Sequence, residues 1–362
     1  MPFKKVSLKI TACLVILFAI GFFVFFPAYL DKQTNLLHDS HLPVISAQAR
    51  TLHAQLIIGD WHSDTLLWKR DLMDKHDYGH MDIPRLQQGN VALQMLTTVT
   101  KSPDGINYEE NSTDASDNIT KLALVSLWPA KTWDSLAERA LFQAGKALEL
   151  VNEFPQHVSL ITSKSELARF ILERKANPQL FGLLLGTEGS HALDGDLNNI
   201  QRLFDSGFRM MSLQHFFDNK LGGSLHGESG EGLTTFGREA IQKMQSLGIM
   251  VDVSHSTEQV VKDVLAMSNQ PLLVSHTGFY GHCPSPRNIS DDLMQQIAAN
   301  DGLIAVGYWD GAVCEPNVIE IAKAIKYGIE LVGSEHIALG SDYDGATSVP
   351  FDTSELIYLT QA

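Results

Sequence analysis

Residues 56–65 have the sequence LIIGDWHSDT, in which an apolar run leads into His62 and Asp64. Residues i and i+2 of a strand lie on the same face, so the pattern predicts a buried strand whose end points an imidazole and a carboxylate in one direction. A nitrogen and an oxygen ligand that converge in this way favour a divalent metal ion. A solvated loop pair is the commoner origin of a single His-x-Asp, so support has to come from the rest of the chain.

Seven further apolar runs follow along the chain, and most of them also end in a histidine or a carboxylate. They cover residues 91–96, 181–189, 208–215, 249–255, 271–276, 303–309 and 336–342. Segments with apolar residues at helical spacing separate most of these runs, at residues 136–154, 198–205, 234–247, 257–267, 291–300 and 318–332. Continuous apolar strands indicate a parallel sheet that is covered on both faces. Eight strand–helix units of this kind predict an α/β fold of the (β/α)8 TIM-barrel type.

An open, doubly wound sheet is the alternative to the barrel. It would gather polar residues near one switch point of the sheet. In this chain polar residues end the first, third, fourth, fifth, sixth and eighth predicted strands. Because only a closed ring brings so many strand ends to one place, the barrel is the better prediction.

Residues 100–135 contain turn residues and little periodicity, and they are predicted to form an extended surface loop. Such a loop could cap a site, with help from Trp128 and Trp133. An excursion over the surface without a functional role is an equal alternative.

The composition limits the class of protein. Of the 362 residues, 44% are hydrophobic and 19% are charged, which is typical of a globular protein. The formal net charge of −15 argues against a nucleic-acid partner, because phosphates require a basic surface.

The N-terminus is predicted to hold a membrane anchor. Residues 10–30 carry no charge, and as a helix they would measure about 31 Å, enough to cross a bilayer core. Three lysines precede them, so residues 1–9 are expected in the cytoplasm. Residues 31–50 would then form a tether. Residues 51–362 would lie outside the cytoplasm, on the periplasmic face of a bacterial inner membrane. A cleaved signal peptide is the alternative, although the nearest Ala-x-Ala, residues 47–49, lies far beyond the apolar segment.

The chain has three cysteines, and Cys13 lies inside the apolar N-terminal segment. In an oxidising compartment Cys283 and Cys314 could form a disulfide, whereas two separate buried thiols are the alternative.

The residues predicted at the carboxyl ends of the strands are His62, Asp64, Glu188, His215, His255, His276 and Asp342. Imidazoles and carboxylates without a thiolate suit zinc or another borderline divalent ion. They are too many for one tetrahedral ion, so we expect two zinc ions that share a carboxylate, with Glu188 as the natural bridge. Two ions about 3.5–4 Å apart can hold a bridging hydroxide that attacks a carbonyl. Neither Gly-x-Ser-x-Gly nor His-Glu-x-x-His occurs, in agreement with water as the nucleophile.

Several segments resemble the membrane dipeptidase (renal dipeptidase-like) family of zinc peptidases, within the amidohydrolase-type metal-dependent TIM barrels. They are DWHSDTLL at 60–67, GTEGSHAL at 186–193, RMMSLQHFFDN at 209–219, GLTTFGREAI at 232–241, VDVSHS at 251–256, SHTGFYGHCPSPRNISDD at 275–292 and HIALGSDYDGA at 336–346. The His-x-Asp of the first strand is also the family's pattern, whereas most relatives in the wider superfamily carry His-x-His. Trp61 and Ser63 fill the variable places of this motif, so the floor of the pocket is expected to differ.

The resemblance implies a role for each of the matching residues. His62 and Asp64 would bind one zinc ion, His255 and His276 the other, and Glu188 would bridge them. The remaining implied residues are His215 for stabilising the oxyanion, Arg287 for the substrate's terminal carboxylate, Asp342 for proton transfer, and Cys283 with Cys314 as a disulfide.

The resemblance therefore implies zinc-dependent hydrolysis of dipeptides, with tolerance of a C-terminal D-residue. Hydrolysis of a β-lactam or of an N-acyl amino acid is the alternative, and a catalytically impaired binding protein is a third reading. Family members continue beyond the eighth strand, so a chain that ends at Ala362 is expected to be truncated. A homodimer is left open.

Overall fold

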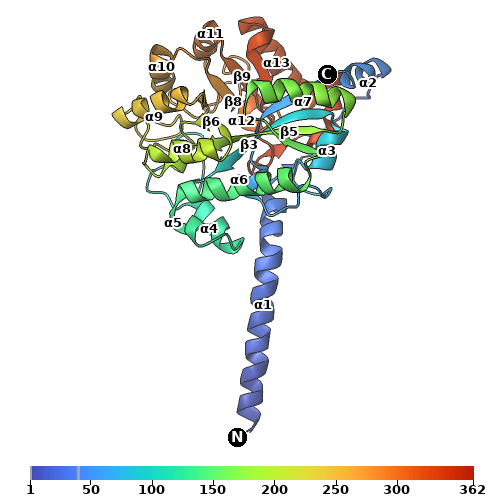
Figure 1. Cartoon of the computed structure of the whole chain (residues 1–362), viewed down its shortest axis with the longest axis vertical. Coiled ribbons are helices and arrows are strands. Elements are labelled where there is room, and N and C mark those ends of the chain that lie inside the picture. Colours follow the sequence, from blue (N-terminus) through green and yellow to red (C-terminus); the bar gives the residue numbers. More distant parts are fainter. Residues whose placement is uncertain (1, 39–40) are drawn as a thin grey trace.

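Eight parallel strands form a closed barrel in the computed structural model, which describes residues 2–38 and 41–362 apart from the side chains of residues 2–8, 10 and 15–19 (Figure 1). The barrel strands are β2 (Ile58–Ser63), β3 (Val91–Val99), β5 (Phe181–Glu188), β6 (Phe208–Ser212), β7 (Met250–Asp252), β8 (Leu273–Thr277), β9 (Leu303–Val306) and β10 (Ile337–Leu339). The ring closes where β3 pairs with β5 and where Leu339 of β10 pairs with Asp60 of β2. The predicted TIM barrel is confirmed, and each predicted strand corresponds to one strand of the ring.

The interior of the barrel is packed with side chains from its strands. Met95, Met210 and Leu273 are buried there, and Trp61 packs against them. Trp61 thus fills space below the strand ends, as expected for a large residue in the variable place of the His-x-Asp motif. A filled interior leaves the carboxyl ends of the strands as the place for a site.

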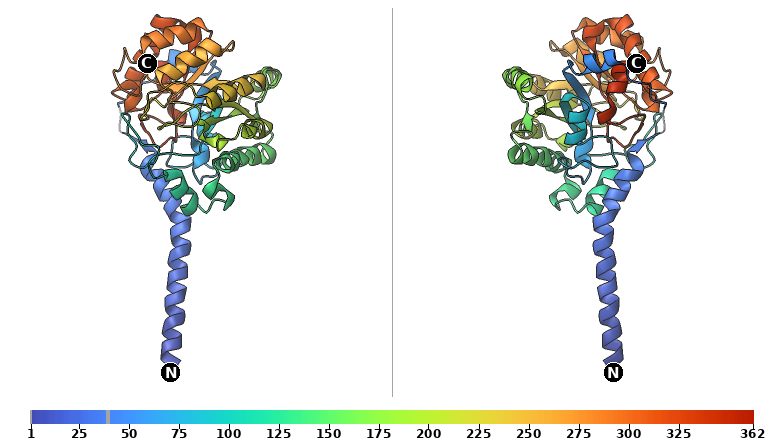
Figure 2. Two further views of the ribbon diagram at one scale, coloured as in Figure 1. Left: turned by 90° about the vertical axis from the view of Figure 1, so that its left-hand side faces the viewer. Right: turned by 90° about the vertical axis from the view of Figure 1, so that its right-hand side faces the viewer.

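Helices cover the outside of the ring (Figure 2). The predicted ones are observed as α6 (Leu136–Glu153), α8 (Asn198–Asp205), α9 (Thr235–Ser246), α10 (Glu258–Met267), α11 (Asp291–Ala299) and α13 (Val318–Val332). Several begin at a side-chain cap: Ser135, Thr234, Thr257 and Asn317 each accept a hydrogen bond from a backbone N–H of the first turn.

Other short elements were not predicted. They are α3 (Ile83–Gln88), β4 (Val158–Leu160), α7 (Lys164–Ala176), α12 (Asp310–Val313), α14 (Ile357–Gln361) and the 3-10 turns Thr65–Leu67, Ser190–Leu193, Ser334–His336 and Thr353–Glu355. β4 pairs with β5 beside the ring and adds no strand to it.

The prediction of an extended loop for residues 100–135 is wrong over part of its length. The segment contains α4 (Asn118–Val125) and α5 (Lys131–Asp134). Asp117 caps α4 and also accepts a bond from the buried Arg139 of α6, at 2.6 Å. Trp128 is buried in a cluster with Leu67 and Trp68, so its role is packing and not capping.

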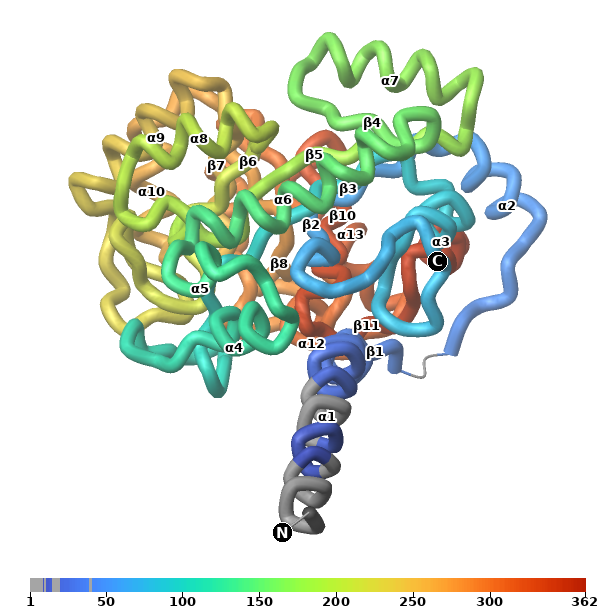
Figure 3. The backbone as a smooth tube through the Cα atoms, turned by 60° about the horizontal axis from the view of Figure 1, so that its bottom comes forward, coloured from blue at the N-terminus to red at the C-terminus, as the bar shows by residue number. Residues whose placement is uncertain are grey.

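The N-terminal helix α1 (Pro2–Thr34) projects from the barrel beside α4, which it contacts (Figures 1 and 3). Within the described part of the chain no helix combines the length and the apolar character that crossing a membrane requires. The side chains of residues 10 and 15–19, within the transmembrane helix predicted at residues 10–30, lie outside the described part.

Residues 31–50, the predicted tether, include segments that pack on the barrel; residues 39–40 lie outside the described chain. The strand β1 (Leu36–Leu37) pairs in parallel with β11 (Ser348–Val349), and α2 (Ala47–His53) follows. Asp31 is buried and bonds to Nε of Arg70 at 2.8 Å, and Arg70 also pairs with Asp344 at 2.7 Å. This ionic cluster, Asp31–Arg70–Asp344, joins the end of α1 to the loops after β2 and β10.

The predicted disulfide between Cys283 and Cys314 is confirmed. It connects the loop after β8 to the residue that follows α12, in the loop after β9. Two neighbouring loops at the mouth of the barrel are thereby held together.

Candidate metal centre

The seven predicted strand-end residues meet at the mouth of the barrel, and all of them are buried. His62 is in β2 with Asp64 directly after it, Glu188 ends β5, His276 is in β8, and the others follow β6, β7 and β10 as His215, His255 and Asp342. His255 and Asp342 have left-handed backbone, with φ of 62° and 60°. A non-glycine residue in this region costs about 1–3 kcal/mol and is typical of functional sites.

Glu188 lies at the centre of the group. Its Oε1 is 3.4 Å from Nε2 of His62 and 3.3 Å from Nε2 of both His255 and His276. Its Oε2 is 3.4 Å from Nε2 of His215. One carboxylate therefore contacts four imidazoles, as a bridging ligand would.

Ser275 fixes the orientation of two of these imidazoles. Its hydroxyl donates to Oδ2 of Asp252 at 2.7 Å, so its only proton is used. The same oxygen lies 3.0 Å from Nδ1 of His62 and 3.1 Å from Nδ1 of His276, and both rings must donate to it. Each ring consequently turns an Nε2 lone pair towards Glu188.

Nε2 of His255 reaches the same place, 3.3 Å from Oε1 of Glu188. Nη2 of Arg287 donates to Nε2 of His255 at 3.2 Å, and this nitrogen is only 2.9 Å from Nε2 of His276. Nε2 of His62 has no hydrogen-bond partner within the described chain. Acceptor atoms that crowd together in this way need a cation between them, so the residues fit a metal.

The electrostatics support the same conclusion. Burial lowers the pKa of His62, but Glu188 and Asp64 outweigh it and hold that pKa well above its usual value. Burial and the nearby Arg287 hold the pKa of His255 well below the usual value, and burial with His62 does the same to His276. The centre therefore attracts positive charge while two imidazoles stay neutral, which is the form that binds metal.

Three overlapping groups bring their ligand atoms within 4.8 Å of one another. They are His62, Asp64 and Glu188; Glu188, His215 and His255; and His62, His276 and Asp342. Glu188 and His62 each belong to two of the groups, so the cluster offers overlapping sets of ligands for a metal.

Two buried aspartates, which the sequence did not point to as site residues, hold the ligand segments in place. Oδ1 of Asp60 accepts from the backbone N–H of His62 at 3.0 Å, and Asp60 also binds the N–H of Ser341. Oδ1 of Asp252 accepts from the N–H of Ser254 and of Ser275. Their signal in the sequence is a charged residue inside an apolar run, two or three positions before a ligand.

Arg287 lies beside the ligands with its side chain buried. It donates to the carbonyl oxygen of His276 at 3.0 Å and to Oγ1 of Thr277 at 3.4 Å, and its guanidinium lies over the ring of Trp309. With the bond to His255, these contacts use three of its five N–H groups. Arg287 is thus in place to bind an anionic group through the other two.

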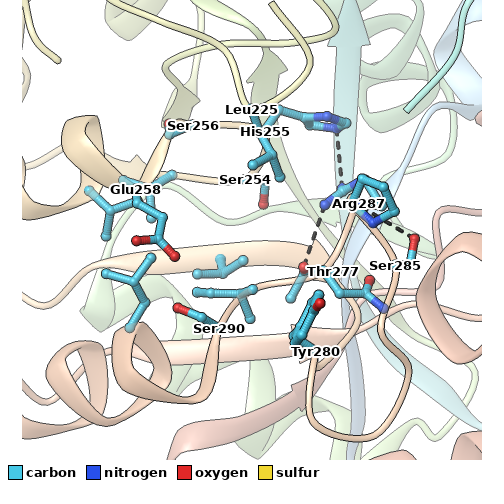
Figure 4. A pocket seen from close by; sticks show the side chains of 17 residues that line it. Leu225, Ser254, His255, Ser256, Glu258, Thr277, Tyr280, Ser285, Arg287 and Ser290 are labelled. Atoms are coloured by element: carbon cyan, nitrogen blue, oxygen red, sulfur yellow. Dashed lines mark hydrogen bonds between the residues drawn. The ribbon is translucent and has the colours of Figure 1, made fainter. Parts of the chain in front are cut away.

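The guanidinium of Arg287 also separates two cavities. A cavity of about 650 Å³ contains the metal ligands Asp64, Glu188 and His255 in its wall. A smaller cavity of about 290 Å³ lies on the other side, between α10 and α11, with Glu258, Tyr280 and Ser290 in its wall (Figure 4). The larger cavity adjoins the ligands directly and is the candidate substrate site.

The loop after β3 reaches the larger cavity, though not through its tryptophans. Ile106, Asn107 and Tyr108 lie in the cavity wall, whereas Trp133 is 42% exposed. The ring of Tyr108 stacks on Phe216 and its carbonyl oxygen bonds to Nδ1 of His226. The prediction that this loop could cap a site is right about the segment and wrong about the residues.

Asp342 has a carboxyl group in the wall of the same cavity. Burial, together with the negative charges of Glu188 and Asp64, raises the pKa of Asp342 well above its usual value. It is therefore the carboxyl of the centre that most readily takes up a proton.

A (β/α)8 barrel with buried histidines and carboxylates at its mouth defines the class of metal-dependent hydrolases built on TIM barrels. The family model described as "Membrane dipeptidase (Peptidase family M19)" matches residues 46–362. The chain belongs to this family, and it is a metallo-dipeptidase, a hydrolase that acts on the peptide bond of dipeptides.

Curated relatives agree with this assignment. Dipeptidase aclJ of Aspergillus oryzae is 26% identical over 376 residues, which cover 96% of this chain and 79% of the relative. An uncharacterized dipeptidase of Schizosaccharomyces pombe is 24% identical over 280 residues, with 75% and 62% covered. The chain thus spans less than two thirds of the second relative.

Solved structures show the same fold. The probable dipeptidase PvdM of Pseudomonas aeruginosa superposes with a TM-score of 0.70 at 18% identity, over 87% of this chain and 90% of that one. A metallopeptidase of Rhodobacter sphaeroides, liganded with a phosphinate mimic of the dipeptide L-Ala-D-Ala, gives 0.68 at 22% identity, over 84% and 91%.

Proposed function

We propose that the protein hydrolyses dipeptides, including those with a C-terminal D-residue, with two zinc ions held at the mouth of the barrel. The observation that carries the proposal is the convergence of three imidazole Nε2 atoms on Oε1 of Glu188, described above. The phosphinate mimic of L-Ala-D-Ala in the Rhodobacter relative supports a D-residue at the C-terminal position.

Bound zinc would polarise the scissile carbonyl and make a water acidic enough to attack it at neutral pH. His62, Asp64, Glu188, His255 and His276 would hold the ions. Glu188 is the only one of them in contact with all the imidazoles named above, so it would serve as the bridge.

Arg287 would fix the substrate by its terminal carboxylate. The guanidinium is permanently charged, and its Nε–H and one Nη1–H remain available as donors to a carboxylate. Because the arginine is buried and stacked on Trp309, the bond would form in a water-poor place where it contributes strongly to positioning.

His215 and Asp342 would act on the reacting atoms. Nδ1 of His215 bonds to the carbonyl oxygen of Lys101 at 3.1 Å, which directs Nε2 at the centre, where the ring would stabilise the oxyanion. Asp342 lies beside His62 and His276 and would take a proton from the attacking water and pass it to the nitrogen of the leaving amine.

The test combines metal analysis with turnover of Xaa-L-Ala and Xaa-D-Ala dipeptides by the purified full chain. We expect two zinc equivalents and hydrolysis of both series. Asp64→Ala should lose one equivalent and nearly all activity, whereas the control Asp74→Ala, at an exposed position, should lose neither. Fewer than two equivalents without turnover of any dipeptide would overturn the proposal.

Arg287→Ala separates dipeptides from other amide substrates. We expect KM for free-carboxylate dipeptides to rise at least tenfold, because the carboxylate loses its partner. Unchanged turnover of these dipeptides would instead favour a lactam or another amide without that carboxylate.

We also propose that the barrel acts outside the cytoplasm, at the periplasmic face of a bacterial inner membrane. The disulfide between Cys283 and Cys314 supports an oxidising compartment. The three lysines before the uncharged residues 10–30 support this orientation, and attachment through that segment stays a prediction from the sequence. Cell fractionation with a thiol-alkylation assay tests it: cytoplasmic protein with free Cys283 and Cys314 would contradict it.

A further inference from the structure

The larger cavity has two chemically different halves. One half carries the charged groups of the metal centre and Arg287, and the other is apolar. The apolar half is formed by Leu30, Leu67, Trp68, Val99, Ile119 and Leu122, which also pack against one another in one cluster. A mechanism that acts only on the peptide bond gives this half no role.

The end of α1 forms part of the apolar wall. Phe26, Leu30 and Thr34 line the cavity at four-residue spacing, and so lie on one face of the helix. The neighbouring Phe25 points elsewhere, with 72% of its side chain exposed. α1 also contacts α4, which supplies Ile119 and Leu122. The N-terminal helix is therefore part of the candidate substrate site.

The position of this wall is fixed relative to the metal centre. The Asp31–Arg70–Asp344 cluster begins at the residue directly after Leu30, and Asn35 binds both Asp31 and the N–H of Ala346. Ala346 itself lines the cavity, four residues after Asp342. α1 thus belongs to the same rigid frame as the loop that carries Asp342.

The order of the strands sets the direction of a bound substrate. Arg287 follows β8, and Ile119 and Leu122 follow β3. In the ring β2-β3-β5-β6-β7-β8-β9-β10, β3 and β8 are four strands apart and hence on opposite sides. A dipeptide with its carboxylate at Arg287 and its peptide bond at the metal centre would extend its N-terminal residue towards α1 and α4.

We infer that the preferred substrates are dipeptides whose N-terminal residue carries a large apolar group, which lies between α1 and α4. This inference rests on the proposed dipeptidase function. A cavity of about 650 Å³ falls within the range of about 300–1,000 Å³ that accepts drug-sized ligands, and two small residues would leave its apolar half unfilled. Phe26 and Leu30 are then specificity-determining residues.

The experiment measures kcat/KM of the zinc-loaded full chain for Ala-Ala, Leu-Ala, Phe-Ala and 2-aminodecanoyl-Ala. Each methylene group buried in the transition state can raise kcat/KM by up to about fourfold. We expect the longest substrate to exceed Ala-Ala by at least tenfold. A flat series with good Ala-Ala turnover would overturn the inference and leave the dipeptidase function standing, whereas no turnover of any member would overturn the function itself.

Two variants test whether α1 causes the preference for a large apolar N-terminal residue. Phe26→Ala removes part of the wall and Leu30→Trp fills the apolar half, so each should lower the ratio of kcat/KM for the longest substrate to that for Ala-Ala at least threefold. The matched control Phe25→Ala should keep the wild-type ratio. Wild-type ratios in both wall variants, or an equal fall in the control, would overturn the role of α1. Because the readout is a ratio within one protein, partial misfolding does not imitate it.

Discussion

The hydroxyl of Ser275 determines how two ligands of the metal centre present their nitrogens. Its proton goes to Asp252, and its oxygen accepts from Nδ1 of His62 and of His276. Such outer-shell partners fix the tautomer and raise the basicity of a ligand. One small side chain therefore prepares imidazoles that stand 214 positions apart in the sequence, at 62 and 276.

Ser275→Ala should consequently weaken metal binding while leaving every ligand present. The loss of the shared acceptor frees both rings to flip, and we expect a fall of about 10–100-fold in zinc affinity. Competition against a chelator of known affinity measures it. Ser268→Ala, which removes another buried hydroxyl outside the centre, is the control, and equal affinities in the two variants would contradict the role of Ser275.

At the level of single residues, the meeting of the candidate ligands could be predicted because each ends an apolar run. Ser275 and Asp252 could not be assigned, because their roles depend on contacts between β2, β7 and β8 that exist only in the closed ring.

Among the structural elements, the loop from β8 to α11 carries the most function. It holds Arg287 and is tied at Cys283 to Cys314 behind α12. Asn288 adds bonds to the carbonyl oxygens of Cys283 and Ala312. Arg287 therefore stands on a loop that is attached to the neighbouring loop at Cys283, before the arginine, and at Asn288, after it.

Replacing both cysteines by serine should destabilise the protein and loosen this loop. The bridge closes 31 positions of chain, for which the entropy of the unfolded state predicts a loss of about 3–4 kcal/mol in the free energy of unfolding. Denaturant unfolding at fixed zinc concentration measures the loss, and KM for dipeptides should rise as Arg287 becomes less well placed. A reductant should destabilise the wild type and have no further effect on the double variant; an effect on both would show another cause.

Several elements that the sequence analysis did not predict are short. α5 has four residues and β4 has three, too few to show periodicity. α4 has eight, and its cap Asp117 was a visible signal, but the polar residues around it favoured a loop. The long helices α6 and α13 were predicted within a residue of their observed ends, since periodicity accumulates over several turns.

On the scale of the whole molecule, Arg70 connects three separate parts of the chain. It pairs with Asp31 at the end of α1 and with Asp344 after β10, and all three side chains are buried. Burial raises the pKa of Asp31 to about 6, although Arg70 opposes the shift. The single guanidinium is thus the main compensation for two buried carboxylates.

Arg70→Met should leave those carboxylates without a partner. Removing one member of a buried ion pair costs about 3–5 kcal/mol, and we expect a loss of that size in the free energy of unfolding, with faster proteolysis of the segment after α1. The matched control is Arg202→Met, whose arginine pairs with Glu138 at 2.6 Å while 49% exposed, and which should cost less than about 1 kcal/mol. Similar losses in both variants would show that the cluster does not hold α1.

The barrel as a whole was predictable because polar residues end six of the eight predicted strands, and only a closed ring brings so many strand ends to one place. The docking of α1 was not, since it depends on buried charges contributed by the loops after β2 and β10. Nothing in the sequence between residues 31 and 38 indicates which distant loop the end of α1 will contact.

The pairing of β1 with β11 has a consequence for the order in which the chain folds during synthesis. Leu36 pairs with Ser348, and Leu339 closes the ring on Asp60, so both contacts must wait for the last part of the chain. At about 5–20 residues per second, the roughly 300 intervening residues take on the order of 15–60 s. Throughout that interval β2 presents an unpaired edge to the surroundings, and β9 presents one from its own synthesis until β10 emerges; unpaired edges favour association with other chains. The N-terminal helix, although it emerges first, would be among the last elements to reach its native position.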